Sequence, residues 1–482
     1  MKQSRKEFLK IAGLSGFVLA GAGMATARAT AGSEVSPVAS GHPHEPGRRF
    51  YKQQFNMAGY AAPALEQVRV GVIGTGSRGR SNTGRFARVE GVEIVALCDL
   101  EDSAVNATVE ELKQITSRHS PALYHGTQDV WKELCDRDDI DLVIINTPWH
   151  LHAPQAVYAM EKGKHVATEI PAAQTVEECW QLVETSERTR RHCFQMTNVC
   201  YGFFEMVTLN MARAGFFGEV IHGEGAYIHQ LMDYNFSKTQ YQNMWRLREN
   251  SRRNGNLYPH HGLGTIAQIM DINHGDRMDF MVSVSSADFM MGNRARELAK
   301  TDSAFEEFVG LPYRGNMSTS IIKTEMGRTI MLQHDVTSPR PYTRIHAISG
   351  TKAMARAYPS PQIGSNYNEG WFSEEKFRQT EAKYTPGITK RVGEEARRVG
   401  GHGGMDTILA WRLVDCLRNG LPLDMNVYDA ALWSAIIPMS EYSVANQGVP
   451  VSFPDFTSGS WKSNKPGMDI ELERGGNTRF VG

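Results

Sequence analysis

Apolar residues recur along the chain in two arrangements, and the change between them lies near residue 200. Before that point, short apolar runs alternate with segments whose apolar residues follow a helical period. Strands and helices that alternate in this way are typical of a doubly wound parallel sheet. The predicted strands cover residues 68–73, 92–98, 142–146, 165–168 and 193–197, and the predicted helices cover residues 78–89, 103–117, 154–162 and 176–189.

After residue 200 the pattern indicates one helix and then longer strands, which favours a second, α+β domain with a mainly antiparallel sheet. Two late helical segments are expected to close the fold. The expected helices cover residues 204–214, 406–419 and 428–446, and the expected strands cover residues 219–229, 280–288, 319–325, 329–335 and 344–349. We therefore place the domains at residues 67–197 and 198–482.

The amino terminus has the composition of an export signal. Basic residues precede a glycine- and alanine-rich apolar run, and small residues follow at Ala27-Arg28-Ala29. The run is too short to favour a membrane span. The Ser4-Arg5-Lys6 start resembles a twin-arginine signal with Lys6 in place of the second arginine, so we expect residues 1–29 to direct the protein to the periplasm or otherwise out of the cytoplasm. Residues 30–66, rich in Gly, Pro, Ser and Ala, are predicted to be a linker.

The composition of the chain limits the classes of molecule that it is expected to bind. The chain has 482 residues, 41% hydrophobic and 22% charged, with a net charge of -1. No excess of basic residues is available to bind nucleic acid or an anionic membrane. The six cysteines form no CxxC pair, and we expect buried free thiols rather than disulfides.

A dinucleotide fingerprint follows the first strand. Gly74, Gly76 and Gly79 form a Gly-x-Gly-x-x-Gly turn between a predicted strand and a predicted helix. Glycines in this turn let the backbone approach a pyrophosphate, which the helix amino terminus stabilises. Asp99 ends the second strand, where its carboxylate would bind the ribose hydroxyls and repel a 2′-phosphate. The sequence therefore predicts a Rossmann domain that binds NAD rather than NADP.

Two further motifs end the fourth and fifth strands, at the sheet edge where ligands bind. Thr147-Pro148-Trp149-His150-Leu151-His152 follows one, and Glu169-Ile170-Pro171 follows the other. Together with the fingerprint they resemble the glucose-fructose oxidoreductase and inositol dehydrogenase superfamily. That superfamily has Glu-Lys-Pro where this chain has Ile170, and the lysine lies beside the hydroxyl that loses its hydride. Asp271 and His274 resemble its Asp and His three positions apart; taken alone they would be a helix-end pair on the surface, but the preceding motifs favour a position in the site. Their role is undecided.

More of the chain resembles one branch of that superfamily, the NAD-dependent α-N-acetylgalactosaminidases of glycoside hydrolase family 109, in which the lysine is also absent. The resemblance runs from about residue 66 nearly to the end. The motifs that carry it are Thr197-Asn198-Val199-Cys200-Tyr201, Trp245-Arg246, Leu257-Tyr258-Pro259-His260-His261-Gly262, Arg340-Pro341-Tyr342 and Gly401-His402-Gly403-Gly404-Met405-Asp406. Thr197, His150 and His260 depart from the family's usual residues, which puts fine specificity in question.

The resemblance implies a retaining glycosidase that removes terminal α-linked N-acetylgalactosamine from glycans. Most glycosidases use two carboxylates, but NAD-dependent enzymes are exceptions. NAD would oxidise C3 of the sugar, a side chain would remove the acidified C2 proton, and the C1 substituent would leave. Water would then add, and NADH would reduce C3. The cofactor would stay tightly bound and would not be consumed.

The same resemblance assigns residues. His261 is our first choice as general acid or base, because its ordinary pKa lies closest to neutral, and Tyr258 is the second. The expected substrate-binding residues are Tyr201, Arg246, Tyr258, Pro259, His260, His261 and Tyr342. The expected NAD-facing residues are Gly74, Gly76, Ser77, Arg78, Gly79, Asp99, Trp149, His150, Leu151, His152, Glu169, Ile170, Asn198 and Tyr258.

Other functions stay open at this point. The chain could be an exported sugar oxidoreductase that uses NAD or NADP, or a nucleotide-bearing sugar-binding protein without turnover. His260, His261 and His274 raise the question of zinc, but no ligand spacing supports it, and we expect no metal. The role of His402 is undecided, and a homodimer is plausible by analogy only.

Overall fold

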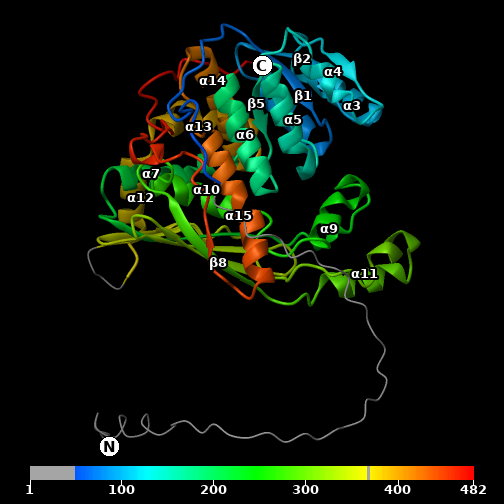
Figure 1. Cartoon of the computed structure of the whole chain (residues 1–482). Helices are drawn as coiled ribbons and strands as arrows, with labels where there is room; N and C mark the ends of the chain where they lie inside the picture. Colours follow the sequence, from blue (N-terminus) through cyan, green and yellow to red (C-terminus); the bar gives the residue numbers. More distant parts are fainter. Residues whose placement is uncertain (1–48, 366–369, 482) are drawn as a thin grey trace, which may run out of the picture. The chain divides into compact units, whose positions relative to one another are not determined.

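The computed structural model describes residues 49–365 and 370–481. The predicted export signal and the first part of the predicted linker lie outside these ranges. Figure 1 shows the described chain as two sheets with helices packed around and between them.

The amino-terminal part forms a six-stranded parallel sheet in the order β3-β2-β1-β4-β5-β6, which confirms the predicted doubly wound architecture. Its strands are β1 (Val68–Ile73), β2 (Val92–Cys98), β3 (Ala122–Tyr124), β4 (Leu142–Ile145), β5 (His165–Thr168) and β6 (Cys193–Gln195). Its helices are α2 (Ser77–Ala87), α3 (Asp102–Ile115), α4 (Trp131–Cys135), α5 (Trp149–Glu161) and α6 (Val176–Thr189).

Two differences from the predicted elements affect the edge of this sheet. The short elements β3 and α4 were not predicted, because three mostly exposed residues and a five-residue helix leave no periodic apolar signal. The helix α5 begins at Trp149 and continues through Pro154, whereas the sequence pattern started it at residue 154. The residues of the Trp149-to-His152 motif therefore lie on the first turn of α5 rather than in a loop.

The second sheet has eight strands in the order β13-β12-β11-β7-β10-β9-β8-β14. Only the central pair β7 and β10 is parallel, so the predicted mainly antiparallel sheet is confirmed. Its strands are β7 (Val220–Ile228), β8 (Met278–Ser285), β9 (Ser318–Thr324), β10 (Thr329–Asp335), β11 (Ala347–Gly350), β12 (Ala353–Arg356), β13 (Gln362–Ser365) and β14 (Val451–Ser452).

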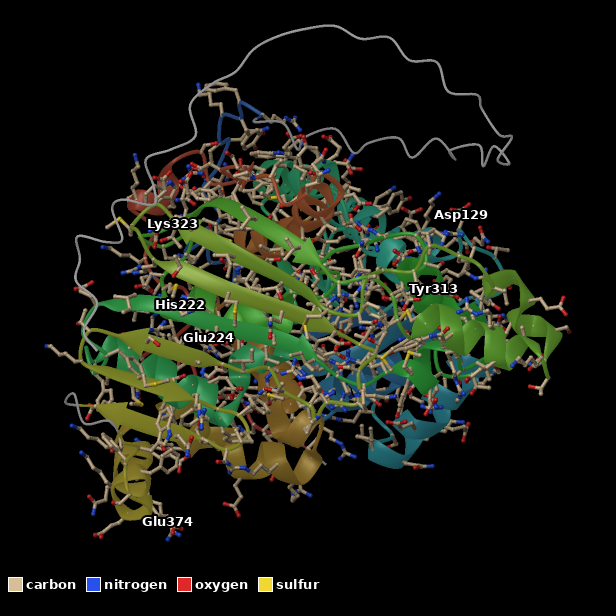
Figure 2. All side chains as sticks on the ribbon, turned by 90° about the horizontal axis from the view of Figure 1, so that it is seen from below. Asp129, His222, Glu224, Tyr313, Lys323 and Glu374 are labelled. Carbon is tan, nitrogen blue, oxygen red and sulfur yellow. The ribbon has the colours of Figure 1, made fainter. Side chains whose placement is uncertain are left out.

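Helices cover one face of this second sheet, and Figure 2 looks onto the other face, where His222, Glu224 and Lys323 lie on the strands. Helix α10 packs on β7, and α15 packs on both β8 and α6, so α15 joins the two sheets. The helices of this part are α7 (Phe203–Arg213), α8 (Met232–Asn235), α9 (Trp245–Asn250), α10 (His260–Ile269), α11 (Met291–Ala299), α12 (Glu374–Tyr384), α13 (Gly387–Val399), α14 (Met405–Asn419) and α15 (Val427–Ala445).

Two glycines bring α10 unusually close to the sheet. A Cβ atom on Gly225 of β7 would collide with the carbonyl group of Gly262, and a Cβ atom on Gly262 would collide with the backbone at Ala226. Because neither glycine has a side chain, the helix backbone lies directly on the strand. The residues beside these glycines, His261 on the helix and Tyr227 on the strand, are thereby held next to each other.

Residues 49–66, the described part of the predicted linker, pack on the folded body. The Tyr51 hydroxyl donates to Glu187 of α6 at 2.7 Å, and the Tyr428 hydroxyl of α15 donates to the carbonyl oxygen of Phe55 at 3.1 Å. All six cysteines are buried and unpaired, which confirms the expectation of free thiols. Within residues 49–365 and 370–481, no helix combines the length and the apolar character that a membrane crossing requires.

Candidate active site

The fingerprint glycines shape a turn that leaves room for a ligand. Gly74 has a φ of +85°, which favours glycine, and a Cβ atom on Gly79 would collide with the carbonyl oxygen of Gly74. Gly76 is exposed, and a Cβ atom there would meet nothing within 4 Å. No side chain caps the amino end of α2, so its first backbone N–H groups, beginning at Ser77, stay available to an anion.

Asp99 is held beside this turn. One of its carboxylate oxygens accepts the backbone N–H of Thr75 at 2.6 Å, and the other accepts the N–H of Glu101 at 3.1 Å. These bonds fix the carboxylate at the end of β2 while the side chain remains partly exposed. A carboxylate held in this place suits the ribose hydroxyls of NAD.

A network of charges joins the fingerprint to the carboxyl-terminal part of the chain. Arg78 donates to Glu169 at 2.6 Å and binds both carboxylate oxygens of Asp406 at 3.0 and 3.1 Å. The amide nitrogen of Asn198 donates to the same carboxylate at 2.7 Å. Burial by itself would raise the pKa of Asp406, but hydrogen bonds from His402 and Arg78 hold that pKa well below its usual range. Three motifs that are distant in the sequence therefore meet at one buried carboxylate.

Asp406 also orients His402, which lies in a loop of unusual backbone shape. All residues from Gly400 to Gly404 have positive φ, including His402 at +46°. The ring atom Nδ1 of His402 lies 2.7 Å from Asp406, while 57% of the His402 side chain is exposed. The glycines allow this conformation, which presents an oriented imidazole at the surface of the charge network.

Aromatic rings from both parts of the chain meet beside this network. Trp149, at the start of α5, stacks on Tyr258 with ring centroids 5.8 Å apart. The Arg246 guanidinium lies 5.0 Å from the Trp149 ring centroid and 4.9 Å from that of Tyr258. Arg246 donates to the Tyr241 hydroxyl at 2.8 Å, but its second terminal nitrogen is buried without a hydrogen-bond partner among the described residues. A buried donor of this kind favours a ligand that accepts a hydrogen bond.

The second sheet supplies the other side of the cluster. The Tyr227 ring lies 4.7 Å from the Tyr258 ring and 5.1 Å from the His261 ring, measured between centroids. Tyr227 pairs with His334 in the β7–β10 register, and Nδ1 of His334 accepts the backbone N–H of Leu257 at 3.2 Å. This bond anchors the segment that carries Tyr258 and His261 to the sheet.

Burial sets the protonation of the two predicted catalytic groups. Burial, with nearby Arg344, lowers the pKa of His261 well below its ordinary value, so the imidazole is neutral near pH 7. Its Nδ1 atom is buried and has no partner within the described chain. Burial also raises the pKa of Tyr258 well above its ordinary value, so this phenol keeps its proton. His261 can accept a proton, and Tyr258 can donate a hydrogen bond.

Tyr342 lies at the rim of the cluster. It is 38% exposed, its ring centroid lies 4.9 Å from that of His229, and its hydroxyl accepts a hydrogen bond from Arg344 at 3.2 Å. The Tyr227 hydroxyl in turn lies 3.1 Å from Nδ1 of His229. A chain of contacts thus leads from the buried rings to the surface.

Two predicted substrate-binding residues point elsewhere in this structure. Tyr201 is fully buried, and its hydroxyl donates to Asp424 at 3.0 Å, so no part of it is left for a sugar. His260 is also fully buried, and its Nε2 atom lies 3.3 Å from the Ser434 hydroxyl on α15. Both corrections have the same cause: the side chains face packed helices and not the aromatic cluster. Pro259 is buried at the start of α10 and holds the turn between Tyr258 and His261.

The predicted NAD-facing residues after β4 and β5 differ in whether their side chains are free to contact a ligand. His152 is buried, and its two ring nitrogens each lie 2.7 Å from a backbone carbonyl oxygen, those of Thr147 and Pro171. It therefore ties the two loops together and has no nitrogen left for the predicted contact with NAD. Ile170 is 3% exposed, and it fills its place with apolar surface. Leu151 is partly buried, and His150 is exposed at the same helix start.

Asp271 and His274 lie at the other end of α10 from His261, about 15 Å away by the rise of a helix of ten residues. His274 is buried 3.7 Å from Asp429 of α15. Neither residue lies in the aromatic cluster, so their expected position in the site is not found, and the partner of His274 is Asp429. Across residues 49–365 and 370–481, no cluster of three His, Cys, Asp or Glu side chains is placed to hold a metal ion.

Two residues of the site were missed by the sequence analysis. Tyr227 sits in a strand whose alternating pattern shows only that one face is buried, and the contact that matters comes from α10. Asp406 was noted within a motif but was given no role, since its partner Arg78 lies more than three hundred positions earlier. The sequence signal that could have indicated Tyr227 is the pair of glycines at 225 and 262. For Asp406 the signal is the glycine-rich loop that precedes it.

The residues present fit a bound dinucleotide. The open turn at Gly76, the free amino end of α2 and the fixed Asp99 match pyrophosphate and ribose. Two amide atoms near the strand ends, Nδ2 of Asn146 and Oδ1 of Asn198, are buried and have no partner within the described chain. A nicotinamide carboxamide could satisfy such groups.

Family models match both parts of the chain. Residues 68–197 match an oxidoreductase family with an NAD-binding Rossmann fold, and residues 201–463 match the carboxyl-terminal domain of glycosyl hydrolase family 109. Solved structures show the same fold. A NAD-binding oxidoreductase from Klebsiella pneumoniae has a TM-score of 0.61 at 14% identity, and levoglucosan dehydrogenase with NADH has 0.59 at 16%; each similarity covers 81% of this chain and 100% of the other.

Relatives match nearly the whole length. A family 109 protein of Shewanella sp. (strain ANA-3) is 45% identical over 469 residues, and a protein of Shewanella oneidensis named alpha-N-acetylgalactosaminidase is 44% identical over 469 residues. Each match covers 96% of this chain and 98% of the relative. The fold is therefore that of an oxidoreductase, whereas the sequence matches family 109 proteins over 96% of the chain. The chain belongs to glycosyl hydrolase family 109 and is a glycoside hydrolase with an NAD-binding domain.

Proposed function

We propose that this protein removes terminal α-linked N-acetylgalactosamine from glycans with retention of configuration and with tightly bound NAD that is not consumed. The observation that carries the proposal is the meeting of His261, Tyr258 and Tyr227 with the motifs of the nucleotide-binding edge. The name of the Shewanella oneidensis relative supports the sugar.

The protein's part in the reaction follows from the protonation of these groups. When bound, NAD would take a hydride from C3 of the sugar as the C3 hydroxyl loses its proton, which makes a C3 carbonyl that acidifies the hydrogen on C2, and would give the hydride back at the end as that oxygen regains a proton. Neutral His261 removes the C2 proton, and the C1–O bond breaks as the electron pair moves to the leaving oxygen. Arg246, whose second terminal nitrogen makes no hydrogen bond within the described chain, holds a sugar oxygen or the acetamide carbonyl.

The leaving oxygen needs a proton as its bond breaks. His261 is occupied at C2, whereas His402 is exposed and is oriented by Asp406. We therefore assign the leaving-group proton to His402, which then activates the water that adds to C1 from the same face, while protonated His261 returns a proton to C2.

A leaving-group comparison tests His402. The His402→Ala variant should lose about 10²- to 10⁴-fold in kcat on an alkyl glycoside, and clearly less on the 4-nitrophenyl glycoside, whose leaving group needs little protonation. Equal losses on both substrates would remove His402 from this role.

The main test measures hydrolysis of 4-nitrophenyl α-N-acetylgalactosaminide by protein stripped of its nucleotide and then reloaded. We expect cleavage to disappear on stripping and to return with NAD, while the product is free sugar of α configuration and no NADH accumulates. Full cleavage without nucleotide refutes the proposal, and net NADH or a sugar lactone would identify a sugar oxidoreductase instead.

Export and assembly stay predictions. We propose that residues 1–29 direct the protein out of the cytoplasm, which amino-terminal sequencing of the fractionated native protein tests. Sedimentation tests the homodimer.

A further inference from the structure

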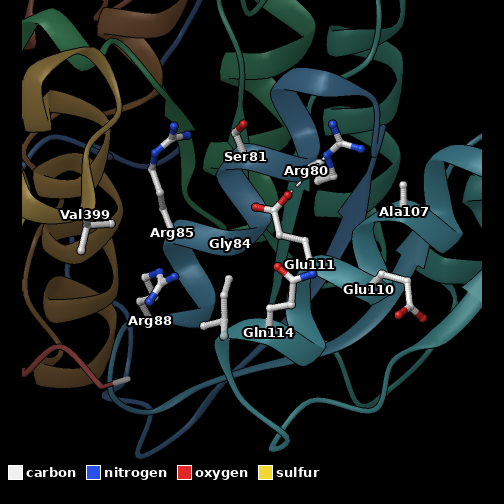
Figure 3. A pocket seen from close by; sticks show the side chains of 11 residues that line it. Arg80, Ser81, Gly84, Arg85, Arg88, Ala107, Glu110, Glu111, Gln114 and Val399 are labelled. Atoms are coloured by element: carbon white, nitrogen blue, oxygen red, sulfur yellow. Dashed lines mark ion pairs between the residues drawn. The ribbon is translucent and has the colours of Figure 1, made fainter.

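A second ligand site lies between α2 and α3, outside the groups used above. A cavity of about 510 Å³ opens there, with the end of α13 at its edge. Figure 3 shows the side chains that line it, among them those of Arg85 on α2, of Arg88 directly after α2, and of Glu111 and Gln114 on α3. Val399, the last residue of α13, closes one side.

The positive charges of this cavity are only partly balanced by carboxylates of the described residues. On one side, Arg80 pairs with Glu111 at 3.4 Å, and Glu110 pairs with Lys113 at 2.7 Å. On the other side, Arg88 is partly buried, and its side chain makes no hydrogen bond and no ion pair within 4 Å to any described residue. The carboxylate within its electrostatic range is that of Glu395 on α13, whose pKa is lowered by Arg398 and also by Arg88. Arg85 is 16% exposed, and its nearest carboxylate, Asp406, lies 3.9 Å away. Burial lowers the pKa of Arg85, which is the mark of a cation with too little compensation.

Neutral donors face the same space. Ser81 and Gln114 line the cavity, and neither side chain has a polar partner within the described chain. Arg85 donates one N–H to the side chain of Asn82 at 3.1 Å, and its other N–H groups remain available to a ligand. Two guanidinium groups, a hydroxyl and an amide thus line one cavity, and most of their N–H and O–H donors make no hydrogen bond within the described chain.

We propose that this cavity binds a tetrahedral oxyanion, a sulfate or phosphate group, between Arg85 and Arg88. Partly buried charges favour a partner of opposite sign, and guanidinium groups bind such oxygens through paired N–H donors. Ser81 and Gln114 complete the donor set. The volume admits the group either as a free ion or as an ester on a sugar.

The site is separate from the nucleotide turn and yet touches the glycine loop. Arg88 follows Gly76 by twelve positions on α2, which corresponds to about 18 Å along a helix. Arg85 packs against Gly401, since a Cβ atom there would collide with its guanidinium group. An anion on Arg85 would therefore press on the loop that presents His402.

Calorimetric titration tests the site on the full NAD-loaded protein, in which the pyrophosphate cradle is filled. Sodium sulfate and sodium phosphate are titrated at constant ionic strength in chloride buffer. We expect saturable binding of one ion, and about tenfold weaker binding by the Arg88→Gln variant, because a charged hydrogen-bonding partner is lost. Arg252→Gln is the matched control, since it removes an exposed arginine elsewhere, and it should bind as the parent does.

A second variant keeps the test decisive if Arg88→Gln fails to fold. Ser81→Asp places a carboxylate in the cavity and should abolish anion binding. Titration with N-acetylglucosamine 6-sulfate separates the two sources: tighter binding than inorganic sulfate identifies an ester on a glycan, and weaker binding identifies the free ion. Absence of saturable binding, or equal affinity in the parent and both cavity variants, overturns the proposal.

Discussion

At the scale of single residues, two buried tyrosines lie in different surroundings and are expected to behave differently. Tyr227 touches Tyr258 and His261, whereas Tyr201 donates to Asp424 in the core between helices. Sequence motifs favoured Tyr201, because it stands in a conspicuous Asn-x-Cys-Tyr segment. The geometry places Tyr227, and not Tyr201, beside the predicted catalytic groups Tyr258 and His261.

Replacement of each hydroxyl separates these roles. Tyr227→Phe should lower kcat/KM about tenfold through loss of one hydrogen bond in the site, with little change in the unfolding free energy. Tyr201→Phe should leave kcat/KM unchanged and lower the unfolding free energy by about 1–3 kcal/mol, because the buried Asp424 loses a donor. Steady-state kinetics and urea unfolding on both variants check this; the reverse pattern would return Tyr201 to the site.

At the scale of elements, the glycine loop between α13 and α14 controls the charge network. Gly400 and Gly401 have similar positive φ values, +91° and +84°. A Cβ atom on Gly400 meets nothing within 4 Å, whereas one on Gly401 would collide with Arg85 and lie 2.9 Å from Asp406. Alanine at Gly400 or at Gly401 would therefore strain the backbone in the same way, but only alanine at Gly401 would collide with neighbouring side chains.

Alanine at these positions isolates the collision. Both variants should lose about 1–3 kcal/mol of stability from the strained backbone. Only Gly401→Ala should also displace Asp406 from Arg78 and raise the dissociation constant for NAD, which fluorescence titration measures. If Gly400→Ala raises the dissociation constant for NAD to the same extent, the contact between Asp406 and Arg78 is not what keeps the nucleotide-binding turn in place.

The elements that sequence could predict are those with local signals. The fingerprint glycines, Asp99 and the strands that carry them follow from spacing and period, and the structure agrees. The start of α5 at Trp149 was missed, because the proline at position 154 resembled a helix start. Long-range contacts such as Asp406 with Arg78, or α10 on β7, could not be derived from a period, since they depend on how the two sheets pack.

At the scale of the whole molecule, buried neutral histidines make stability depend on pH. Burial lowers the pKa of His165 and of His260 to about 3, from an ordinary value near 6.5. Below pH 6.5 these two histidines bind protons in the unfolded chain but stay neutral in the folded protein. Their contribution to stability is therefore fully present above pH 6.5 and is lost as the pH decreases toward 3. The raised pKa of His274 acts in the opposite direction.

Urea unfolding at pH 7.5 and 5.5 tests this dependence in a window above carboxylate titration. We expect lower stability at pH 5.5, by about 1.4 kcal/mol per pH unit below 6.5 for each such histidine. The His260→Gln variant should show a smaller difference between the two pH values. Equal or greater stability at pH 5.5 would mean that these rings are protonated in the folded state.

The central claim is that temporary oxidation of C3 allows His261 to remove the proton from C2. The most direct measurement is cleavage of an α-N-acetylgalactosaminide in deuterated water by the NAD-loaded protein, with free N-acetylgalactosamine incubated alongside as a control for later exchange. The account predicts deuterium at C2 of the released sugar from the first turnover. Release of sugar that keeps its original C2 hydrogen would contradict it.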